Sequence, residues 1–231
     1  MRKLKLVVIS GCNRGLGYGI AKCFANKGFR VVGLNKTLCN ENWMTEIKCN
    51  ILNKDEIDSA VKKIVSDFGK IDILVNNAGI RRFGNISEIS EEDWEVSLET
   101  NLTAPLRLLQ KTSEHLSKSN GIIFFIGSHA GEHFYEESVA YSSTKAALHA
   151  MAEVAVKDLR YKGIRVCCLS LGAISNIKME DDDWKMKPSD VGELLVLLES
   201  LPKRVMPAYV EMRPSKPSKS PITGMEYLQF I

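Results

Sequence analysis

Short apolar segments rich in valine and isoleucine recur along the chain, and longer segments with helical periodicity separate them. Apolar runs without alternating polar positions are typical of strands that helices cover on both faces. A weaker strand is predicted at residues 46–49 and a last one at residues 208–212. The stronger strands are predicted at residues 4–10, 29–34, 71–76, 121–126 and 164–170.

Between these strands, apolar residues return every three or four positions, which is the spacing of one helix face. After the first strand these residues are Leu16, Ile20, Cys23 and Phe24. Two more helices are predicted to begin at polar caps, Asn53-x-x-Glu56 and Ser90-x-x-Asp93. A long helix closed by Gly163 is predicted over residues 138–160, and the last helix over residues 189–200.

This alternation of strand and helix predicts the fold class. The expectation is α/β, a single-domain Rossmann-type, doubly wound parallel sheet of about seven strands with helices on both faces. The domain is predicted to span residues 1–213. The tail at residues 214–231, rich in proline, serine and lysine, is predicted to be irregular.

The composition is that of an ordinary globular domain, with 231 residues of which 45% are apolar and 26% charged. A net charge of +3, without a basic helix or stripe, argues against a nucleic-acid partner. The apolar runs are strand-sized, so neither a membrane span nor a signal peptide is predicted. Six cysteines without a Cys-x-x-Cys pair favour a reduced, cytoplasmic setting.

The first predicted strand leads directly into a glycine-rich turn, Ser10-Gly11-Cys12-Asn13-Arg14-Gly15-Leu16-Gly17, and then into a helix. A dinucleotide pyrophosphate binds where backbone N–H groups at a helix N-terminus are open to approach. The alternative is a tight strand–helix connection that binds no ligand. The residues predicted to bind the cofactor here are Gly11, Asn13, Arg14, Gly15, Leu16 and Gly17.

The glycine spacing, together with Asn76-Asn77-Ala78-Gly79 after a later strand, resembles the short-chain dehydrogenase/reductase family over about residues 4–212. The resemblance implies that Asn77, Ala78 and Gly79 support the central strands beside the adenosine half of the cofactor. It also implies contacts near adenine at Asn50 and Ile51, and near nicotinamide at Gly172, Ile174 and Asn176. The residues Asn50, Leu171 and Asn176 depart from the usual family pattern.

The end of the second strand bears on the choice of nicotinamide cofactor. Enzymes that use NAD carry Asp or Glu there, because the carboxylate holds the ribose 2′-hydroxyl. Asn35 stands at that place, Lys36 follows it, and Arg14 lies in the glycine turn. Two cations without a carboxylate favour a 2′-phosphate, so NADP(H) is the predicted cofactor and NAD(H) the alternative. If Lys36 is instead an ordinary surface lysine in contact with water, it gives no support for NADP(H).

Tyr141 and Lys145 lie one turn apart on the long predicted helix. Ser128 precedes Tyr141 by the spacing of the family's active site, and Asn101 matches its fourth member. Tyr141, Lys145, Ser128 and Asn101 are therefore the predicted catalytic residues, and Tyr141 and Lys145 are also predicted to contact the cofactor.

The Tyr-x-x-x-Lys spacing is not specific by itself. Tyr18 and Lys22 have it too, but they lie in the helix after the glycine turn, where no serine accompanies them. This second pair is interpreted as coincidental.

Reduction of a carbonyl needs a hydride on carbon and a proton on oxygen, so an acid must accompany the cofactor. A free tyrosine with a pKa near about 10 is too weak, and an ammonium group about 4 Å away lowers that pKa. Tyr141 is therefore predicted to donate the proton in reduction and to accept it in oxidation. The resemblance implies that Lys145 holds the nicotinamide ribose, Ser128 binds the substrate oxygen and Asn101 positions a water near Lys145.

Three functions are compatible with these residues. The first is an NADP(H)-dependent ketone reductase or alcohol dehydrogenase, such as a 3-oxoacyl reductase or a biosynthetic ketone reductase. The second is a catalytically silent NADP(H)-binding sensor or scaffold, which the departures at Leu171 and Asn176 leave open. The third, an epimerase or dehydratase of a related branch, lacks the expected glycine spacing and substrate domain.

Further residues bear on the partners. Arg81 and Arg82 follow the Asn-Asn-Ala-Gly motif and could face an anionic or carrier-bound substrate, although surface charge is the commoner role. His129 and His133 follow Ser128 and could line the pocket. The histidines lack metal-ligand spacing, so no metal is predicted. By resemblance to the family, a homodimer or homotetramer is expected.

Overall fold

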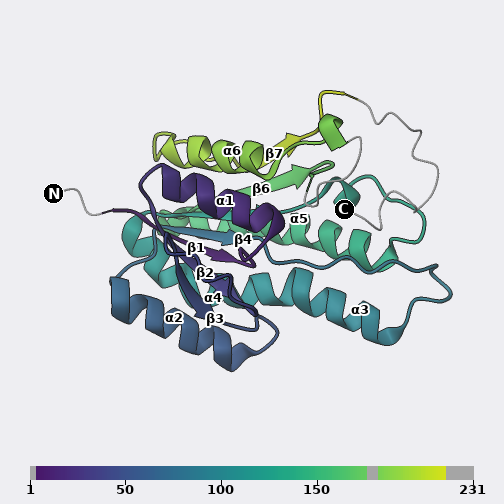
Figure 1. Cartoon of the computed structure of the whole chain (residues 1–231), viewed down its shortest axis with the longest axis horizontal. Coiled ribbons are helices and arrows are strands. Elements are labelled where there is room, and N and C mark those ends of the chain that lie inside the picture. Colours follow the sequence, from purple (N-terminus) through teal and green to yellow (C-terminus); the bar gives the residue numbers. More distant parts are fainter. Residues whose placement is uncertain (1–3, 176–181, 217–231) are drawn as a thin grey trace.

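The computed structural model describes residues 4–175 and 182–216, and in this part of the chain seven parallel strands form one sheet (Figure 1). The sheet order is β3-β2-β1-β4-β5-β6-β7, so the order reverses beside β1. Ligands of open α/β sheets bind at such a point, outside the carboxyl ends of the strands. The strands are β1 (Leu6–Ser10), β2 (Arg30–Asn35), β3 (Thr45–Lys48), β4 (Ile73–Asn76), β5 (Ile122–Ile126), β6 (Arg165–Leu171) and β7 (Tyr209–Met212).

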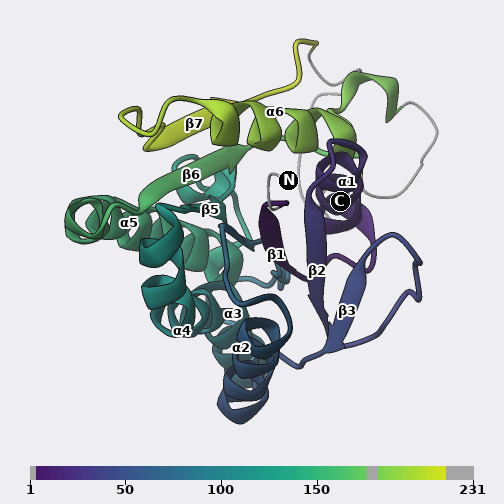
Figure 2. The same ribbon diagram turned by 90° about the vertical axis from the view of Figure 1, so that its left-hand side faces the viewer.

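Helices cover both faces of the sheet (Figure 2). On one face lie α1 (Gly15–Asn26) and α6 (Pro188–Ser200), over an apolar layer that includes Phe24 and Phe124. On the other lie α2 (Lys54–Phe68), α4 (Ala104–Ser119) and α5 (Val139–Leu159), over a layer that includes Leu74 and Phe125. The predicted fold class is confirmed, and burial on both faces explains why the apolar runs do not alternate. None of the described helices is both long and apolar enough to cross a membrane.

The remaining helical segments are short. They are α3 (Glu91–Leu98), the π-helical turn η1 (Glu99–Thr103), and the 3₁₀ turns η2 (His129–Gly131), η3 (Arg160–Lys162) and η4 (Asp182–Trp184). The helix predicted to open at Ser90 does begin there, but it widens into η1 before continuing as α4. The apolar pattern did not predict this turn, because one extra residue in a turn shifts the spacing without interrupting it.

The polar caps start the helices largely as predicted. Asn53 Oδ1 accepts from the N–H groups of Asp55 and Glu56, and Ser90 Oγ accepts from Asp93 N–H at 3.1 Å. Glu56 does not complete a capping box, since its carboxylate accepts from the backbone N–H of Asn50 at 2.8 Å, while the N–H of Asn53 donates to the Asn50 carbonyl. The position of Asn50 in the folded chain, after β3, determines which N–H group the Glu56 carboxylate binds, and sequence spacing does not show that position.

The cysteines are free thiols, and five of the six are buried. Burial raises the pKa of Cys12, Cys167 and Cys168 to about 12. These residues therefore pack as small apolar side chains in the two layers around the sheet.

A buried ion pair joins the last helix to the sheet. Arg165 at the start of β6 is 2% exposed and Glu199 of α6 is 4% exposed, with a nitrogen–oxygen distance of 3.9 Å. The Arg165 guanidinium also donates to the backbone carbonyls of Leu198, Glu199 and Leu201. The Glu199 carboxylate accepts from Lys5 Nζ at 2.6 Å. Glu199 thus compensates the buried Arg165 charge, and its own charge is compensated by Lys5 as well.

Replacing Glu199 by alanine leaves the Arg165 charge buried without its anion. We expect the free energy of unfolding to fall by about 3–5 kcal/mol, measured by urea denaturation. The control is Glu193→Ala on the same helix, whose ion pair with Lys27 spans 3.3 Å between largely exposed side chains. It should change the same free energy by less than about 1 kcal/mol. Equal effects of the two substitutions would contradict this account.

Candidate active site

The glycine turn joins β1 to α1 at the carboxyl edge of the sheet. Gly11 and Gly15 have φ angles of +66° and +56°, in the left-handed region that favours glycine. A Cβ on Gly17 would lie 2.2 Å from the Gly11 carbonyl oxygen and 2.4 Å from Asn77 Nδ2, so a larger residue does not fit there. The three glycines keep side chains away from the N-terminus of α1.

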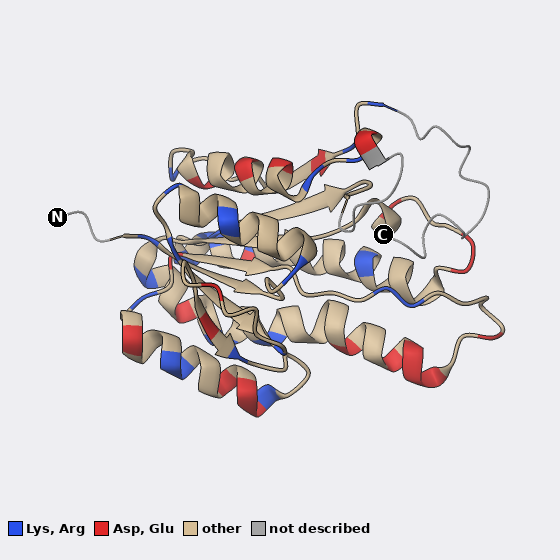
Figure 3. Ribbon diagram, viewed as in Figure 1, with Lys and Arg blue, Asp and Glu red and all other residues tan. Residues whose placement is uncertain are grey.

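This helix N-terminus has the features of an anion-binding site. The N-cap residue of α1, Arg14, makes no side-chain cap, whereas Asn53 and Ser90 cap α2 and α3 with their own oxygens. The first turn of α1 contains no acidic residue, while that of α3 contains three (Figure 3). Uncapped N–H groups and the positive end of the helix dipole fit the pyrophosphate of a dinucleotide.

The Asn76–Gly79 motif is bonded directly to this turn. Asn77 Nδ2 donates to the carbonyl oxygens of Ser10 and Gly11 at 3.0 and 2.8 Å. In return, Ser10 Oγ accepts from the N–H groups of Asn77 and Ala78, both at 3.1 Å. The motif therefore holds the loops after β1 and β4 at a fixed separation.

Asn35, at the end of β2, is 1% exposed and its amide is bonded on both sides. Its Oδ1 accepts from Cys12 N–H at 2.8 Å, and its Nδ2 donates to Glu46 Oε1 at 2.7 Å. Glu46 also accepts from the backbone of the loop between β2 and β3, at Cys39 and Asn40. Sequence reasoning missed Glu46, since its role depends on a contact between neighbouring strands.

The two cations predicted near the cofactor, Lys36 and Arg14, are exposed at the carboxyl edge of the sheet.

Four other residues predicted near the cofactor lie at the carboxyl edge of the sheet or just past it. Asn50 and Ile51 follow β3, and Ile51 packs against the layer under α2 and α4. Gly172 follows β6 and donates its N–H to the Met212 carbonyl at 2.8 Å, and Ile174 is buried. Asn176 lies outside the described residues.

Tyr141 and Lys145 lie on the first two turns of α5, and Ser128 follows β5, so the fold brings the three together. All three are buried, with exposed fractions of 9%, 5% and 8%. The Lys145 ammonium lies 5.8 Å from the centre of the Tyr141 ring and donates to the Ile126 carbonyl at 2.8 Å. This hydrogen bond to a backbone carbonyl at the end of β5 holds the ammonium beside the phenol.

The electrostatic surroundings favour the phenolate form of Tyr141. Burial alone raises the pKa of this phenol, but the Arg81 and Lys145 charges and hydrogen bonds from Ser128 and Arg81 lower it to about 8. Burial lowers the pKa of the Lys145 ammonium, and the charge of Arg81 acts in the same direction. The phenol is therefore much more acidic than a free tyrosine.

Arg81 is a site residue whose position the sequence left open. Its guanidinium carbon lies 5.2 Å from the centre of the Tyr141 ring, and its side chain is half-buried. Arg82 lies exposed, with its Nε 2.8 Å from Asp93 Oδ1 of α3. The two adjacent arginines therefore differ completely in their surroundings, and no local sequence signal separates them.

Asn101 lies in the π-helical turn η1 and is 1% exposed. Its Oδ1 accepts from Ile80 N–H at 2.8 Å, and its Nδ2 donates to the Ile80 carbonyl at 2.9 Å and to Thr144 Oγ1 at 3.0 Å. Thr144 Oγ1 in turn donates to the Tyr141 carbonyl at 2.8 Å. Asn101 thus joins the segment after the Asn76–Gly79 motif to α5, the helix of Tyr141 and Lys145.

The structure explains why a glycine precedes Ser128 at position 127. A Cβ on Gly127 would lie 2.4 Å from His149 Nε2 and 2.7 Å from the Leu169 carbonyl oxygen. His149 lies two turns after Tyr141 on α5, and its Nδ1 is 3.1 Å from Glu132 Oε1. The histidine ring occupies the space that a serine side chain would need.

His129 and His133 lie together near β7, with ring centres 4.6 Å apart. With Glu211 they offer ligand atoms within 4.8 Å of one another. The Arg213 guanidinium, however, bonds both to the Glu211 carboxylate and to His133 Nε2. A protein cation is thus already present in this group.

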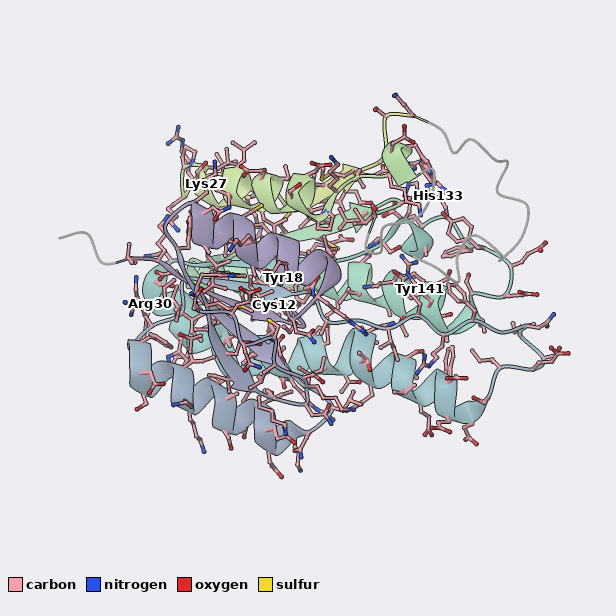
Figure 4. The ribbon with its side chains drawn as sticks, in the orientation of Figure 1. Cys12, Tyr18, Lys27, Arg30, His133 and Tyr141 are labelled. Atoms are coloured by element: carbon pink, nitrogen blue, oxygen red, sulfur yellow. The ribbon has the colours of Figure 1, made fainter. Side chains whose placement is uncertain are left out.

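Tyr18 and Lys22, the second Tyr-x-x-x-Lys pair, lie away from the serine. Tyr18 Oη donates to Glu41 Oε1 at 2.7 Å, and Lys22 Nζ lies 4.4 Å from the Trp43 ring centre. Figure 4 shows Tyr18 well apart from Tyr141. The pair packs the loop between β2 and β3 against α1.

Comparison with known proteins gives relatives along nearly the whole chain. A family model described as short chain dehydrogenase matches residues 5–187. A Staphylococcus saprophyticus protein, named an uncharacterized oxidoreductase, is 31% identical over an alignment 227 positions long, which covers 91% of this chain and 97% of that protein.

Solved structures share the fold. An alcohol dehydrogenase from the archaeon Thermococcus sibiricus, complexed with 5-hydroxy-NADP, has a TM-score of 0.86 at 23% identity, covering 95% of this chain and 100% of that one. A metagenomic short-chain oxidoreductase in complex with NADP has a TM-score of 0.81 at 24% identity, covering 92% and 98%. The chain therefore belongs to the short-chain dehydrogenase/reductase family of oxidoreductases.

Proposed function

We propose that the protein uses NADP(H) to reduce a ketone, or to oxidise the corresponding secondary alcohol, with Tyr141 as general acid and base. The observation that carries this proposal is the buried Tyr141 phenol, whose pKa two cations and a serine lower to about 8. Burying Lys145 beside this phenol costs solvation free energy, and such an arrangement is typical of a group that must exchange a proton near neutral pH.

The residues present fit a dinucleotide at the edge of the sheet, because the uncapped N-terminus of α1 and the glycine turn accept its pyrophosphate. When bound, the cofactor supplies or accepts the hydride at the substrate carbon. Lys36 and Arg14 favour the 2′-phosphate of NADP, since the neutral amide of Asn35 replaces a carboxylate at the end of β2.

Tyr141 moves the proton. In reduction its O–H donates to the carbonyl oxygen as negative charge develops there, and in oxidation its phenolate accepts the alcohol proton. Lowering the pKa of a phenol by two units favours its phenolate by about 3 kcal/mol. Ser128 donates a hydrogen bond to the same substrate oxygen, and Lys145 stabilises the phenolate while its own bond to Ile126 holds it in place.

Replacing Tyr141 by phenylalanine removes the proton donor and keeps the ring. We expect kcat/KM for ketone reduction with NADPH to fall about 10²- to 10⁴-fold, measured by NADPH absorbance over a panel of ketones. Tyr18→Phe is the matched control, because it removes a phenol with the same lysine spacing. It should retain the activity. A fully active Tyr141→Phe variant would reject the mechanism.

The acidity of Tyr141 sets the pH dependence. Reduction needs the protonated phenol, so kcat/KM for reduction should fall with increasing pH, with half of it lost near pH 8. Oxidation needs the phenolate, so kcat/KM for oxidation should rise through the same range. Steady-state rates between pH 6 and 10 measure both. A flat profile, or opposite trends, would rule out this assignment.

The NADP preference follows from Arg14 and Lys36. We expect NADPH to bind more tightly than NADH, and Lys36→Ala and Arg14→Ala each to weaken NADPH binding about 10-fold or more, measured by cofactor fluorescence. NADH binding should change less in Lys36→Ala. Lys27→Ala, at the opposite end of α1, is the control. Tighter binding of NADH than of NADPH by the wild-type protein would reject the preference.

A further inference from the structure

His149 lies on α5, one turn after Lys145, and packs against the loop that carries Ser128. A Cβ on Gly127 would lie 2.4 Å from His149 Nε2, and a Cβ on Gly131 would lie 2.9 Å from His149 Cε1. These two glycines stand before and after Ser128 in the chain. The segment that carries the serine therefore bends around the imidazole ring and touches it on both sides of Ser128.

Two further contacts fix the orientation of this ring. His149 Nδ1 lies 3.1 Å from Glu132 Oε1, and a carboxylate can only accept, so Nδ1 is the nitrogen that donates. The Tyr209 ring of β7 meets the imidazole in a T-shaped arrangement, with ring centres 5.9 Å apart. Tyr209 Oη also donates to the same Glu132 oxygen. The ring is thus held by an acid and by the edge strand of the sheet.

The ring acts on Gly127 by contact. Within the part of the chain that the structure describes, His149 Nε2 is buried without a hydrogen-bond partner. Burial and the Lys145 charge lower the pKa of His149, and the Glu132 carboxylate raises it, with a net decrease. The ring is therefore uncharged at neutral pH and adds no charge to the site. Any effect of His149 on the reaction must pass through the position of the loop.

The position of this loop matters because of the Ser128 hydroxyl. Its oxygen accepts from Ala130 N–H at 3.2 Å and so starts the short turn η2. The same hydroxyl is hydrogen-bonded to Tyr141 and is one of the groups that lower the pKa of this phenol. A single 3₁₀ turn has few backbone hydrogen bonds of its own, so its position depends on what it packs against.

We propose that His149 is a positioning residue, whose ring keeps the Ser128 hydroxyl beside Tyr141 and the substrate oxygen. Glu132 acts one step further away, by orienting that ring. The proposal rests on the proposed function, which places the substrate oxygen at Tyr141 and Ser128. Misplacing a group in an active site by about 1 Å can reduce the rate about 100-fold, so a side chain that only supports the loop can have a large effect.

His149→Ala removes the ring. We expect kcat for ketone reduction with NADPH to fall about 10- to 100-fold, and KM for NADPH to change less than about twofold. The second value stays because Asn77, and not His149, holds the glycine turn. His115→Ala, which removes a histidine of α4 outside the site, is the control and should keep the activity.

Two milder variants test how the ring is held. His149→Asn keeps an N–H group that can donate to Glu132 in place of Nδ1, and it should recover part of the lost rate. Glu132→Ala keeps the ring and releases it, so kcat should fall by a smaller factor than in His149→Ala. Glu132 has an exposed side chain, so this variant tests the proposal even if His149→Ala does not fold.

The pH profile separates positioning from a loss of folded protein. If Ser128 moves away, the pKa of Tyr141 rises, the phenol stays protonated to higher pH, and the midpoint of reductase activity near pH 8 should move upward. Loss of folded protein would lower the rate at every pH and leave this midpoint in place. The other groups that act on the phenol, Arg81, Lys145 and Tyr135, are kept in His149→Ala. An unchanged midpoint overturns the proposal.

A double-mutant cycle tests whether His149 acts through Ser128. In the Ser128→Ala background, His149→Ala should lower kcat by less than about twofold further, because the hydroxyl that the ring positions is absent. If His149→Ala lowers kcat by the same factor with and without the hydroxyl, the proposal is overturned.

A measurement without turnover separates this proposal from the proposed function. Tyrosines labelled with ¹³C at Cζ are titrated by NMR in the wild-type protein, His149→Ala and His115→Ala, and Tyr141→Phe assigns the signal. A Tyr141 midpoint that rises only in His149→Ala supports the positioning of Ser128, even if no ketone is reduced. A midpoint that stays the same in His149→Ala overturns it, even in a protein that reduces ketones with NADPH.

Discussion

The hydrogen bonds between Asn77 and the backbone of Ser10 and Gly11 hold together the two loops on which the site depends. These loops follow β1 and β4, the strands between which the sheet order reverses. An unpaired buried amide or carbonyl costs about 1–3 kcal/mol, so this set of bonds favours a single spacing of the loops. At that spacing the turn before α1 stays open, and the chain after Gly79 continues towards Tyr141.

The same principle extends to α5, the helix that carries Tyr141. Asn101 bonds to Ile80 on one side and to Thr144 on the other, and Thr144 bonds to the Tyr141 carbonyl. The glycine turn and Tyr141 are therefore positioned by one series of buried and partly buried hydrogen bonds. Lys145 and Arg81 add charge to this rigid arrangement, and the phenol responds with a lowered pKa. Rigid placement gives these charges their effect, because mobile cations in water would be screened.

Much of the fold and of the glycine turn could be predicted from the sequence, because the patterns that specify them are local. Strands buried on both faces give uninterrupted apolar runs, and a turn that needs left-handed residues requires glycine at Gly11 and Gly15. The remainder depends on contacts between distant segments. Glu46 of β3 bonds to Asn35 of the neighbouring strand β2. The ring of His149, on α5, leaves room only for glycine at position 127. Arg81 and Arg82 are adjacent and chemically identical, so only the folded chain assigns one to the phenol and the other to Asp93.

The wide turn η1 has a consequence for how this part of the chain tolerates length changes. Before the turn, α3 packs on α5, and after it α4 packs on α2 and the sheet, so the two halves present differently oriented faces. The turn takes up one residue more than a regular α-helical turn, so the helix stays continuous while Asn101 bonds to Ile80 and Thr144. A single-residue deletion that closes η1 to an α-helical turn leaves α3 and α4 in register, but it displaces the Asn101 amide. The same deletion within α3 or α4 would instead rotate the residues beyond it by about 100°.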